Sequence, residues 1–508
     1  MCKALKNIIS FLISFSVFFS LFLPINSYAK SKSTKITKDD LIYFIVTDRF
    51  FDGDKSNDIG ADINNPSSYE GGDFQGIIDK LDYIKSLGFT AIWITPVVQN
   101  QEGGYHGYWA TDFYKTNEHF GTMDKLKELV NTAHKKGIKV LFDLVVNHTG
   151  TDNPWVSDPS KASWFHADKP IDYSNQDSIE NGWLAGLPDL NQDNPEVKKY
   201  LIDMAKWWIK ETAIDGYRLD TVKHVPKSFW TDFTKEIKKD YPDFYFVGEV
   251  LNNSAPYVAS YQDTGIDGLL DYPAYYAIDS AFNGTGNAYN LQNIIQQSDT
   301  YSNKSLMATF IDNHDVKRFV STTSDYTEER LKASLTFMMT YTGIPTMYYG
   351  TEIGMGGGDD PDNRRFMDWS KTSPITDYVK KLTSIRKSNE ALTGGDINIL
   401  YCDDEALCFS RQSGNKQIFT VFNTSAKDKH VEIPMDNTAA KKLINLIDNK
   451  KYSVSNGKLT VELAPLGSLI LAPESSNLLI YVLASIAVLF VLAALIVGII
   501  VLKRRKHK

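Results

Sequence analysis

Four acidic side chains stand at or just after the ends of short apolar segments that lie far apart in the chain. Asp143, Asp220 and Glu249 each end such a segment, and Asp315 follows another. Carboxyl groups that lie close together can act as acids, bases or nucleophiles, or can bind a cation. A single carboxylate is usually a surface or capping residue, but four in the same position relative to their segments indicate one acidic site.

These acids need a scaffold that brings the ends of the segments to one face. Between about residues 38 and 389, β-branched or aromatic runs alternate with amphipathic stretches, which is typical of parallel βα units. We therefore predict an α/β fold, a (β/α)₈ TIM barrel, in which the carboxyl ends of the strands converge on one face. The eight predicted strands are Leu41–Thr47, Ala91–Thr95, Lys139–Asp143, Gly216–Asp220, Phe244–Glu249, Ile266–Leu270, Leu306–Ile311 and Thr346–Tyr349.

Changes in composition divide the chain into domains. Residues 30–146 and 195–390 carry the barrel pattern. Residues 147–194 are rich in Asp, Asn, Pro and Trp and lack periodicity, which predicts an inserted domain after the third strand. Residues 391–473 hold short strand-like runs with turn signals and predict a C-terminal antiparallel β-sandwich domain.

The N-terminus has the layout of a secretory signal peptide. In residues 1–29, Lys3 and Lys6 precede an apolar run from about Ile8 to Leu23, and Ser27-Tyr28-Ala29 supplies small residues for cleavage near Ala29. An N-terminal membrane anchor is the alternative, and the shortness of the apolar run speaks against it.

The C-terminus predicts a membrane-spanning helix. Leu478–Leu502 contains 25 residues without a charge, which is long enough to cross a bilayer. The basic tail, residues 503–508, belongs on the cytoplasmic side. We therefore expect a single-pass protein on the extracellular face of the cell membrane, with its N-terminus outside. A buried core helix and a cell-wall sorting signal are alternatives, but Leu471–Ser475 is not the LPxTG-like sequence that a sorting signal needs.

The overall composition excludes some partners and leaves the cysteines open. With 54 Lys and Arg against 62 Asp and Glu, the 508-residue chain has a net charge of −8, which argues against a nucleic-acid partner. Cys2 leaves with the predicted signal peptide. Cys402 and Cys408 lie between two strand-like runs, where a disulfide and two free thiols are both possible, whereas their spacing does not fit a zinc site.

The segments that carry the acids resemble the four signature regions of the α-amylase family, glycoside hydrolase family 13. A fifth segment, Leu187–Asn191, resembles the additional region in the inserted domain of that family. The motifs occur in the family order, and the resemblance covers about Lys38 to Ala472. The four segments are Asp143-Leu144-Val145-Val146-Asn147-His148, Gly216-Tyr217-Arg218-Leu219-Asp220-Thr221-Val222-Lys223-His224, Gly248-Glu249-Val250 and Phe310-Ile311-Asp312-Asn313-His314-Asp315.

This resemblance assigns catalytic roles to three of the acids. It implies that Asp220 is the nucleophile, that Glu249 is the acid and then the base, and that Asp315 stabilises the positively charged transition state. Arg218 lies two residues before Asp220 on the same strand, so both side chains point to the same face, and we expect Arg218 to keep Asp220 ionised. We also expect burial to raise the pKa of Glu249, so that it holds a proton for donation.

The same resemblance implies the residues that bind sugar. Tyr108 corresponds to the tyrosine beneath the sugar ring at the cleavage site, and core packing is the alternative for Tyr108 and Trp109. Three histidines correspond to residues that hydrogen-bond sugar hydroxyls, and others lie on the donor or the acceptor side of the cleaved bond. The full predicted set is His106, Tyr108, Trp109, His148, Arg218, His314, Asp360 and Arg364, with Lys223 and His224 on the acceptor side.

Calcium is the expected cofactor. Asn147, Asp189 and the carbonyl of His224 match the structural calcium site of the family, between the barrel and the inserted domain. A second loop resembles a calcium site of cyclodextrin glucanotransferases and some bacterial amylases, although composition alone also fits a solvated turn. Its candidate residues are Asp52, Asp54, Asn57 and Asp58, together with Gly71 and Asp73.

The resemblance implies a retaining α-amylase that hydrolyses internal α-1,4-glucosidic bonds of starch, glycogen and maltooligosaccharides, and we expect it to act as a monomer. A cyclodextrin glucanotransferase and a maltogenic or cyclodextrin-cleaving enzyme are the alternatives. A non-catalytic glycan-binding surface protein is a more remote one, because Asp220, Glu249 and Asp315 are all present.

Overall fold

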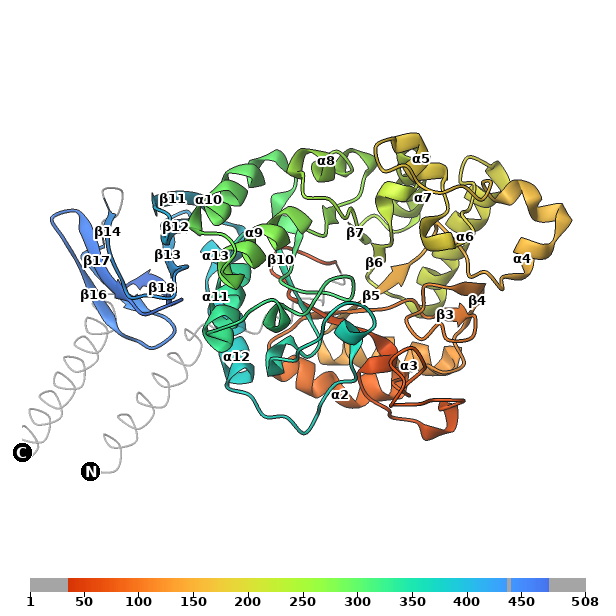
Figure 1. Cartoon of the computed structure of the whole chain (residues 1–508), viewed down its shortest axis with the longest axis horizontal. Coiled ribbons are helices and arrows are strands. Elements are labelled where there is room, and N and C mark those ends of the chain that lie inside the picture. The colour runs from red at the N-terminus through yellow and green to blue at the C-terminus, as the bar shows by residue number, and fades with distance from the viewer. Residues whose placement is uncertain (1–34, 436–439, 475–508) are drawn as a thin grey trace, which may run out of the picture.

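The central part of the chain is a closed barrel of eight parallel strands surrounded by helices (Figure 1). The computed structural model describes residues 35–435 and 440–474. The strand order is β8-β7-β6-β5-β2-β1-β10-β9, and a parallel bridge between Leu270 and Ala308 closes the circle. The predicted barrel is thus confirmed, with strands β1 Ile42–Ile45, β2 Ala91–Ile94, β5 Lys139–Leu144, β6 Gly216–Leu219, β7 Tyr245–Gly248, β8 Gly268–Leu269, β9 Ala308–Thr309 and β10 Ile344–Tyr348.

The helices pack an apolar stripe on the barrel. In α3 (Met123–Lys136), the buried residues Leu126, Leu129, Val130 and Ala133 follow the spacing of one helix face. The strands beneath are buried on both faces, as β1 and β6 show throughout their length. The other helices are α2 Phe74–Ser86, α6 Pro195–Thr212, α7 Lys227–Asp240, α8 Ala255–Ala259, α9 Tyr272–Asn283, α10 Ala288–Gln297, α11 Thr327–Thr340, α12 Pro374–Ser388 and α13 Glu390–Gly394.

Two additions follow the carboxyl ends of strands. A hairpin of β3 (Val98–Asn100) and β4 (Ala110–Thr116), which the sequence did not predict, follows β2. Residues 147–194 lie between β5 and α6, and contain α4 (Pro154–Ser157) and α5 (Gln176–Asn181). The backbone N–H of Leu190 donates to the carbonyl of Asn147 at 2.7 Å, which ties this inserted segment to the barrel.

The C-terminal part is an antiparallel sheet of eight strands, in the order β11-β12-β13-β18-β15-β16-β17-β14. In β17, alternate residues are buried and exposed, which is the pattern of a sheet with one solvated face. The strands are β11 Asp396–Cys402, β12 Ala406–Ser413, β13 Lys416–Asn423, β14 Lys429–Pro434, β15 Lys442–Asn445, β16 Lys451–Ser455, β17 Lys458–Leu463 and β18 Ser468–Pro473.

The register of this sheet shows whether Cys402 and Cys408 can form a disulfide. Cys408 lies opposite Tyr401, and Cys402 lies opposite Leu407. Since neighbouring residues of a strand point to opposite faces, the two sulfur atoms lie on different faces of the sheet. Both cysteines are free.

Two buried arginines bind carbonyls at the end of α11, and one of them, Arg411, comes from the sheet and so joins it to the barrel. Arg411 of β12 donates from Nη1 to the carbonyl of Thr340 at 2.9 Å, and Arg386 of α12 donates from Nη1 to the carbonyl of Met339 at 2.8 Å. These carbonyls end α11, where helix carbonyls lack partners of their own. Burial lowers the pKa of Arg386 to about 9 and that of Arg411 to about 10.

The predicted localisation at the outer face of a membrane is corrected by the structure. Within residues 35–435 and 440–474, no helix combines the length and the apolar character that crossing a membrane requires. The longest of these helices, α6, has 18 residues and carries charges such as Glu196 and Lys206 along it. The predicted signal peptide, membrane helix and basic tail, residues 1–29, 478–502 and 503–508, lie outside the described residues.

Candidate active site

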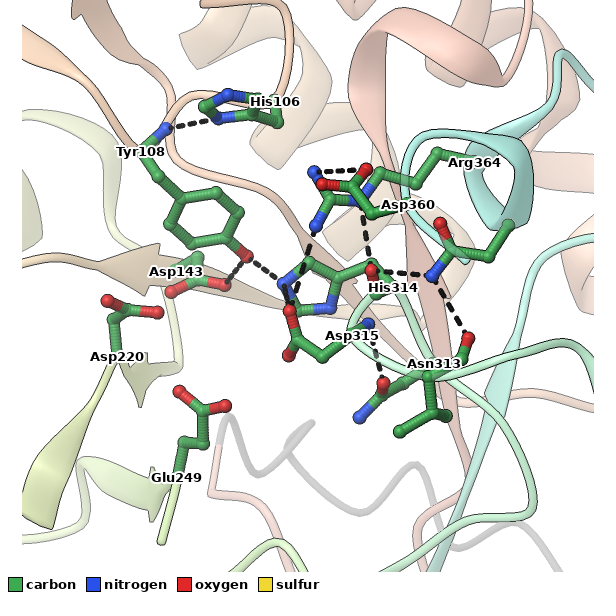
Figure 2. Close-up of polar contacts among 12 residues, drawn as sticks. His106, Tyr108, Asp143, Asp220, Glu249, Asn313, His314, Asp315, Asp360 and Arg364 are labelled. Carbon is green, nitrogen blue, oxygen red and sulfur yellow. Dashed lines mark hydrogen bonds and ion pairs between the residues drawn. The ribbon is translucent and has the colours of Figure 1, made fainter. Parts of the chain in front are cut away.

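The four acids predicted from the sequence converge at the carboxyl ends of the barrel strands. Figure 2 shows the side chains of Asp143, Asp220, Glu249 and Asp315 gathered in one region. Asp143 lies in β5, Asp220 and Glu249 directly follow β6 and β7, and Asp315 lies on the loop after β9. All are largely buried apart from Asp315, whose side chain is 25% exposed.

Arg218 lies at the centre of these acids. Its Nη1 lies 2.9 Å from both carboxyl oxygens of Asp143 and 2.7 Å from Oδ1 of Asp220. Its Nη2 lies 2.8 Å from Oε2 of Glu249. One planar guanidinium therefore holds Asp220 and Glu249 on its two terminal nitrogens, which makes these two carboxyl groups near neighbours.

The three strand-end acids differ in what else they contact. Asp143 Oδ2 also accepts hydrogen bonds from the Tyr108 hydroxyl at 2.8 Å and from Nε1 of Trp93 at 3.2 Å. Asp220 Oδ2, in contrast, is buried and has no hydrogen-bond partner in the part of the chain that the structure describes. Both carboxyl oxygens of Asp143 thus have hydrogen-bond partners, whereas one oxygen of Asp220 remains available for another contact.

The backbone after Asp220 is shaped to contact Glu249. Thr221 has a φ of 45°, which is unusual for a β-branched residue. Its N–H donates to Oε2 of Glu249 at 2.9 Å. This strained conformation at the carboxyl end of β6 gives a hydrogen-bond donor to the same Glu249 oxygen that forms an ion pair with Arg218.

The direction of the pKa shift of Glu249 differs from the prediction. Burial raises the pKa of Asp220 well above its usual range, although Arg218 opposes the shift. Burial and the charge of Glu249 raise the pKa of Asp315 to about 7, and burial raises that of Asp143 to about 6. Burial also acts to raise the pKa of Glu249, but Arg218 and the Thr221 N–H outweigh it and leave this pKa below its usual value.

The predicted sugar-binding residues on the donor side form one connected group. The Tyr108 hydroxyl lies 2.6 Å from Nε2 of His314, and the two rings stack with centroids 5.3 Å apart. His106 Nδ1 accepts from the Tyr108 N–H at 3.1 Å, as Figure 2 shows, and His148 Nε2 lies 3.1 Å from the Tyr108 carbonyl. Trp109 is half-buried and lies edge-on to the His106 ring at 4.4 Å. The structure thus brings these residues together around Tyr108.

Arg364 connects the last members of this side. It pairs with Asp360 at 3.3 Å and lies 3.7 Å from Oδ1 of Asp315. Its Nε donates to the carbonyl of His314 at 2.9 Å. Asp360 is 54% exposed, so it forms the outer end of the group (Figure 2).

The predicted acceptor-side pair lies against the inserted segment. Lys223 Nζ donates to the carbonyl of Leu251 at 2.9 Å and lies 5.7 Å from the ring centroid of Tyr173. The His224 ring is edge-on to the same tyrosine at 6.4 Å. Tyr173 is 62% exposed, whereas Trp164 is packed against Trp155 and is buried.

The first predicted calcium site presents unused oxygens. Asn147 Oδ1 and Asp189 Oδ1 are both buried without a hydrogen-bond partner among the described residues. The other Asp189 oxygen lies 2.6 Å from Nδ1 of His166, and burial raises the pKa of Asp189 to about 6. Two buried oxygens from distant segments fit a hard cation such as calcium.

The second predicted site fits in part. Asp52 Oδ1, Asn57 Oδ1 and Asp58 Oδ1 are buried without a partner among the described residues, and a Cβ on Gly71 would lie 2.7 Å from Asp58 Oδ1. Asp73 instead caps α2 by accepting from the Gly76 N–H, and Asp54 accepts from the N–H of Ser56. In the described ranges, no group of three or more His, Cys, Asp or Glu side chains is close enough together to hold a metal. Amide and backbone oxygens would have to complete either site.

Sequence reasoning missed two residues that contact this site. The Tyr272 hydroxyl donates to Oε1 of Glu249 at 3.3 Å, and Nδ2 of Asn313 donates to the Tyr272 hydroxyl at 3.2 Å. Tyr272 follows the sixth barrel strand, just as the acids follow theirs, so its position in the strand pattern was the available signal.

Comparison with known families agrees with this geometry. Residues 44–392, more than half of the chain, match the family model of the α-amylase catalytic domain. The chain belongs to the α-amylase family. It is thus a glycoside hydrolase, and residues 397–470 match the C-terminal domain model of maltogenic amylases.

Solved α-amylases resemble this α-amylase family member over most of its length. The Anoxybacillus α-amylase is 46% identical, with a TM-score of 0.83, over 86% of this chain and 99% of that one. The Geobacillus thermoleovorans α-amylase, solved with acarbose, is 42% identical, with a TM-score of 0.83, over 87% of this chain and all of that one.

Curated relatives include other activities. The Paenibacillus polymyxa beta/alpha-amylase is 42% identical over 84% of this chain, but the match spans only 37% of that longer protein. The cyclomaltodextrinase of Geobacillus thermopakistaniensis is 32% identical over 86% of this chain and 77% of the relative.

Proposed function

We propose that this family member is a retaining hydrolase of α-1,4-glucosidic bonds, with Asp220 as nucleophile and Glu249 as acid and then base. The observation that carries this proposal is the position of the Arg218 guanidinium. It donates a hydrogen bond to one oxygen of Asp220 and forms an ion pair with one oxygen of Glu249. Asp220 keeps its second oxygen, Oδ2, free of hydrogen bonds in the described structure. A nucleophile needs such an oxygen, held in place through its partner oxygen.

In the first step, Oδ2 of Asp220 bonds to the anomeric carbon while Glu249 gives a proton to the leaving glycosidic oxygen. In the second step, Glu249 takes a proton from water, which attacks the same carbon and releases Asp220. Asp315 faces the positive charge that develops on the sugar ring in both steps.

The first step requires a proton on Glu249. Four carboxyl groups lie close together around Arg218, so they titrate as a coupled group. We infer that a bound glucan draws a proton to Glu249, because the sugar excludes water there and presents its glycosidic oxygen as the acceptor. Asp220 is then left ionised beside Arg218.

The other predicted residues take the roles that their positions favour. Tyr108 supplies a flat face for the sugar ring, and His106, His148, His314, Asp360 and Arg364 supply polar groups around it. Lys223 and His224 face the acceptor side next to Tyr173. We also propose that residues 147–194 act as a separate domain that forms one wall of the site.

Short and cyclic maltooligosaccharides are the preferred substrates in this proposal. The C-terminal match to maltogenic amylases and the cyclomaltodextrinase relative support such a preference. Endo-acting hydrolysis of starch and glycogen is the second candidate, and the 46% identical Anoxybacillus α-amylase supports it.

Calcium is part of the proposal as a structural ion. Asn147, Asp189 and the His224 carbonyl would hold one ion, and the loop containing Asp52, Asn57 and Asp58 a second one. An ion at either place would cross-link chain segments and neutralise buried oxygens.

Time-resolved product analysis tests the substrate proposal. The full chain is incubated with amylose and, separately, with a cyclodextrin, beside its Asp220→Asn variant. Faster cleavage of the cyclodextrin with maltose as the main product supports the maltogenic type. Mixed linear oligosaccharides from amylose, with slow cyclodextrin cleavage, support the endo-acting type. Cyclic or lengthened products contradict hydrolysis as the main reaction.

A further inference from the structure

A chain of hydrogen bonds reaches the Glu249 oxygen that does not pair with Arg218. The Tyr272 hydroxyl donates to Oε1 of Glu249 at 3.3 Å and accepts from Nδ2 of Asn313 at 3.2 Å. Oδ1 of Asn313 accepts from the N–H of Asp315 at 2.8 Å. Tyr272 and Asn313 are both buried, and the chain connects the loop after β9 with the carboxyl end of β7.

The direction of every hydrogen bond in this chain is determined by its ends. The Asp315 N–H can only donate, so it must face the amide oxygen of Asn313, and the Asn313 amide nitrogen must face Tyr272. Since that nitrogen can only donate, the Tyr272 hydroxyl accepts from it and directs its own hydrogen at Glu249. The Tyr272 hydroxyl is therefore oriented as a donor to a carboxylate.

We propose that the Tyr272 hydroxyl, oriented by Asn313, is a positioning group that fixes the rotation of the Glu249 carboxyl group and favours its ionised form. Oε2 is already held by the Thr221 N–H and Arg218. Tyr272 holds the remaining oxygen, so the carboxyl plane is fixed from both sides. This inference rests on the proposed role of Glu249 as the acid and base, and extends it.

The contacts to both carboxyl oxygens of Glu249 favour the same charge state, the ionised carboxylate. Donors on both oxygens stabilise a carboxylate, and the hydrogen bond from Tyr272 is one of the contributions that lower the pKa of Glu249. Removing the hydroxyl should therefore raise this pKa. The other titratable or charged groups that face Glu249 stay in place in such a variant: Asp143, His148, Arg218, Asp220, Lys223, His224 and Asp315.

A titration by NMR tests the inference without any need for catalysis. The full chain is labelled with ¹³C in the glutamate carboxyl groups, and the Glu249 signal is assigned by its loss in Glu249→Gln. Tyr272→Phe removes only the hydroxyl, and we expect the pKa of Glu249 to rise by about 0.5–1 unit. Tyr275→Phe is the matched control, because Tyr275 lies in the same helix and its ring stacks on Phe310. We expect no change there.

A second variant guards against a folding defect. Asn313→Ala removes the group that orients the hydroxyl, so the pKa should rise in this variant as well. A Glu249 titration in folded Tyr272→Phe or Asn313→Ala that matches the wild-type curve would overturn the inference.

The pH dependence of kcat/KM separates this inference from the proposed function. The basic limb, which reports loss of the acid's proton, should move to higher pH in Tyr272→Phe by the same amount as the NMR titration. A shift in the NMR titration without a shift in this limb would leave the positioning role intact, and would contradict Glu249 as the acid.

Discussion

Arg218 Nη1 lies 2.7 Å from Oδ1 of Asp220, while the other oxygen of this aspartate is buried without a hydrogen-bond partner in the described structure. The same guanidinium reaches Glu249 through its second terminal nitrogen. This arrangement underlies the proposed division of roles, because it holds two carboxyl groups close together while leaving an oxygen of Asp220 available to react.

Arg218→Lys should lower kcat by at least about 100-fold on a chromogenic maltooligosaccharide, because a lysine ammonium cannot hold Asp143, Asp220 and Glu249 at once. Arg365→Lys is the control, since Arg365 is an exposed arginine that pairs with Asp362. We expect its kcat to stay within about twofold of wild type, as for most exposed ion pairs. Equal kcat values for Arg218→Lys and wild type would contradict the proposed role of the Arg218 guanidinium in positioning these carboxyl groups.

Asp315→Asn should move the acidic limb of kcat/KM to lower pH. That limb reports ionisation of the nucleophile, and the negative charge of Asp315 is one of the causes that raise the pKa of Asp220, after burial and the charges of Glu249 and Asp143. Removing this charge makes Asp220 easier to ionise. Activated glycosyl fluorides keep the slowed variant measurable, and Asp359→Asn, at an exposed position, is the control. An acidic limb that stays in place or moves upward would count against this explanation.

Asp271→Asn should flatten the pH dependence of stability between about pH 4 and pH 6. Burial raises the pKa of Asp271 to about 6, so the folded state binds a proton more tightly than the unfolded state. Its contribution to stability therefore increases as the pH falls from about 6 towards the unfolded value of about 4, by roughly 2–3 kcal/mol. Asparagine still accepts from the Ala274 N–H and the Tyr301 hydroxyl through Oδ1. Urea unfolding across this range measures the slope, and an unchanged slope would refute the assignment.

Removal of calcium should lower the melting temperature of the wild type by about 5 °C or more, because an ion that binds only the folded state stabilises it. Asn147→Ala should bind fewer calcium ions in equilibrium dialysis and should respond less to chelation. Asp168→Asn, an exposed substitution in the same inserted segment, should behave as wild type. Equal melting temperatures with calcium and with a chelator would exclude a structural ion.

The sequence predicts the barrel well because its signal is local. Strands such as Tyr245–Gly248 are short apolar runs between helical patterns, and the acids at their ends share one register. Once a barrel is assumed, the meeting of Asp143, Asp220 and Glu249 follows from that register. The β3–β4 hairpin carries no such repeated pattern and was missed.

The pKa of Glu249 was not predictable in the same way. The lowered pKa of Glu249 depends on the reach of Arg218 Nη2 and on the positive φ of Thr221, which are properties of the packed site. Tyr272 was missed because its hydroxyl reaches Glu249 from the start of α9, and spacing along the chain does not show such a contact. The free cysteines likewise follow from the strand register, which spacing alone does not determine.

The most direct test of the central claim is the configuration of the first product. Proton NMR of the full chain acting on a maltooligosaccharide resolves the α and β anomers before mutarotation mixes them. Two-step catalysis through Asp220 predicts that the α anomer forms first, and that Asp220→Asn abolishes its formation while remaining folded. Initial formation of the β anomer would show an inverting reaction and would contradict the proposed mechanism.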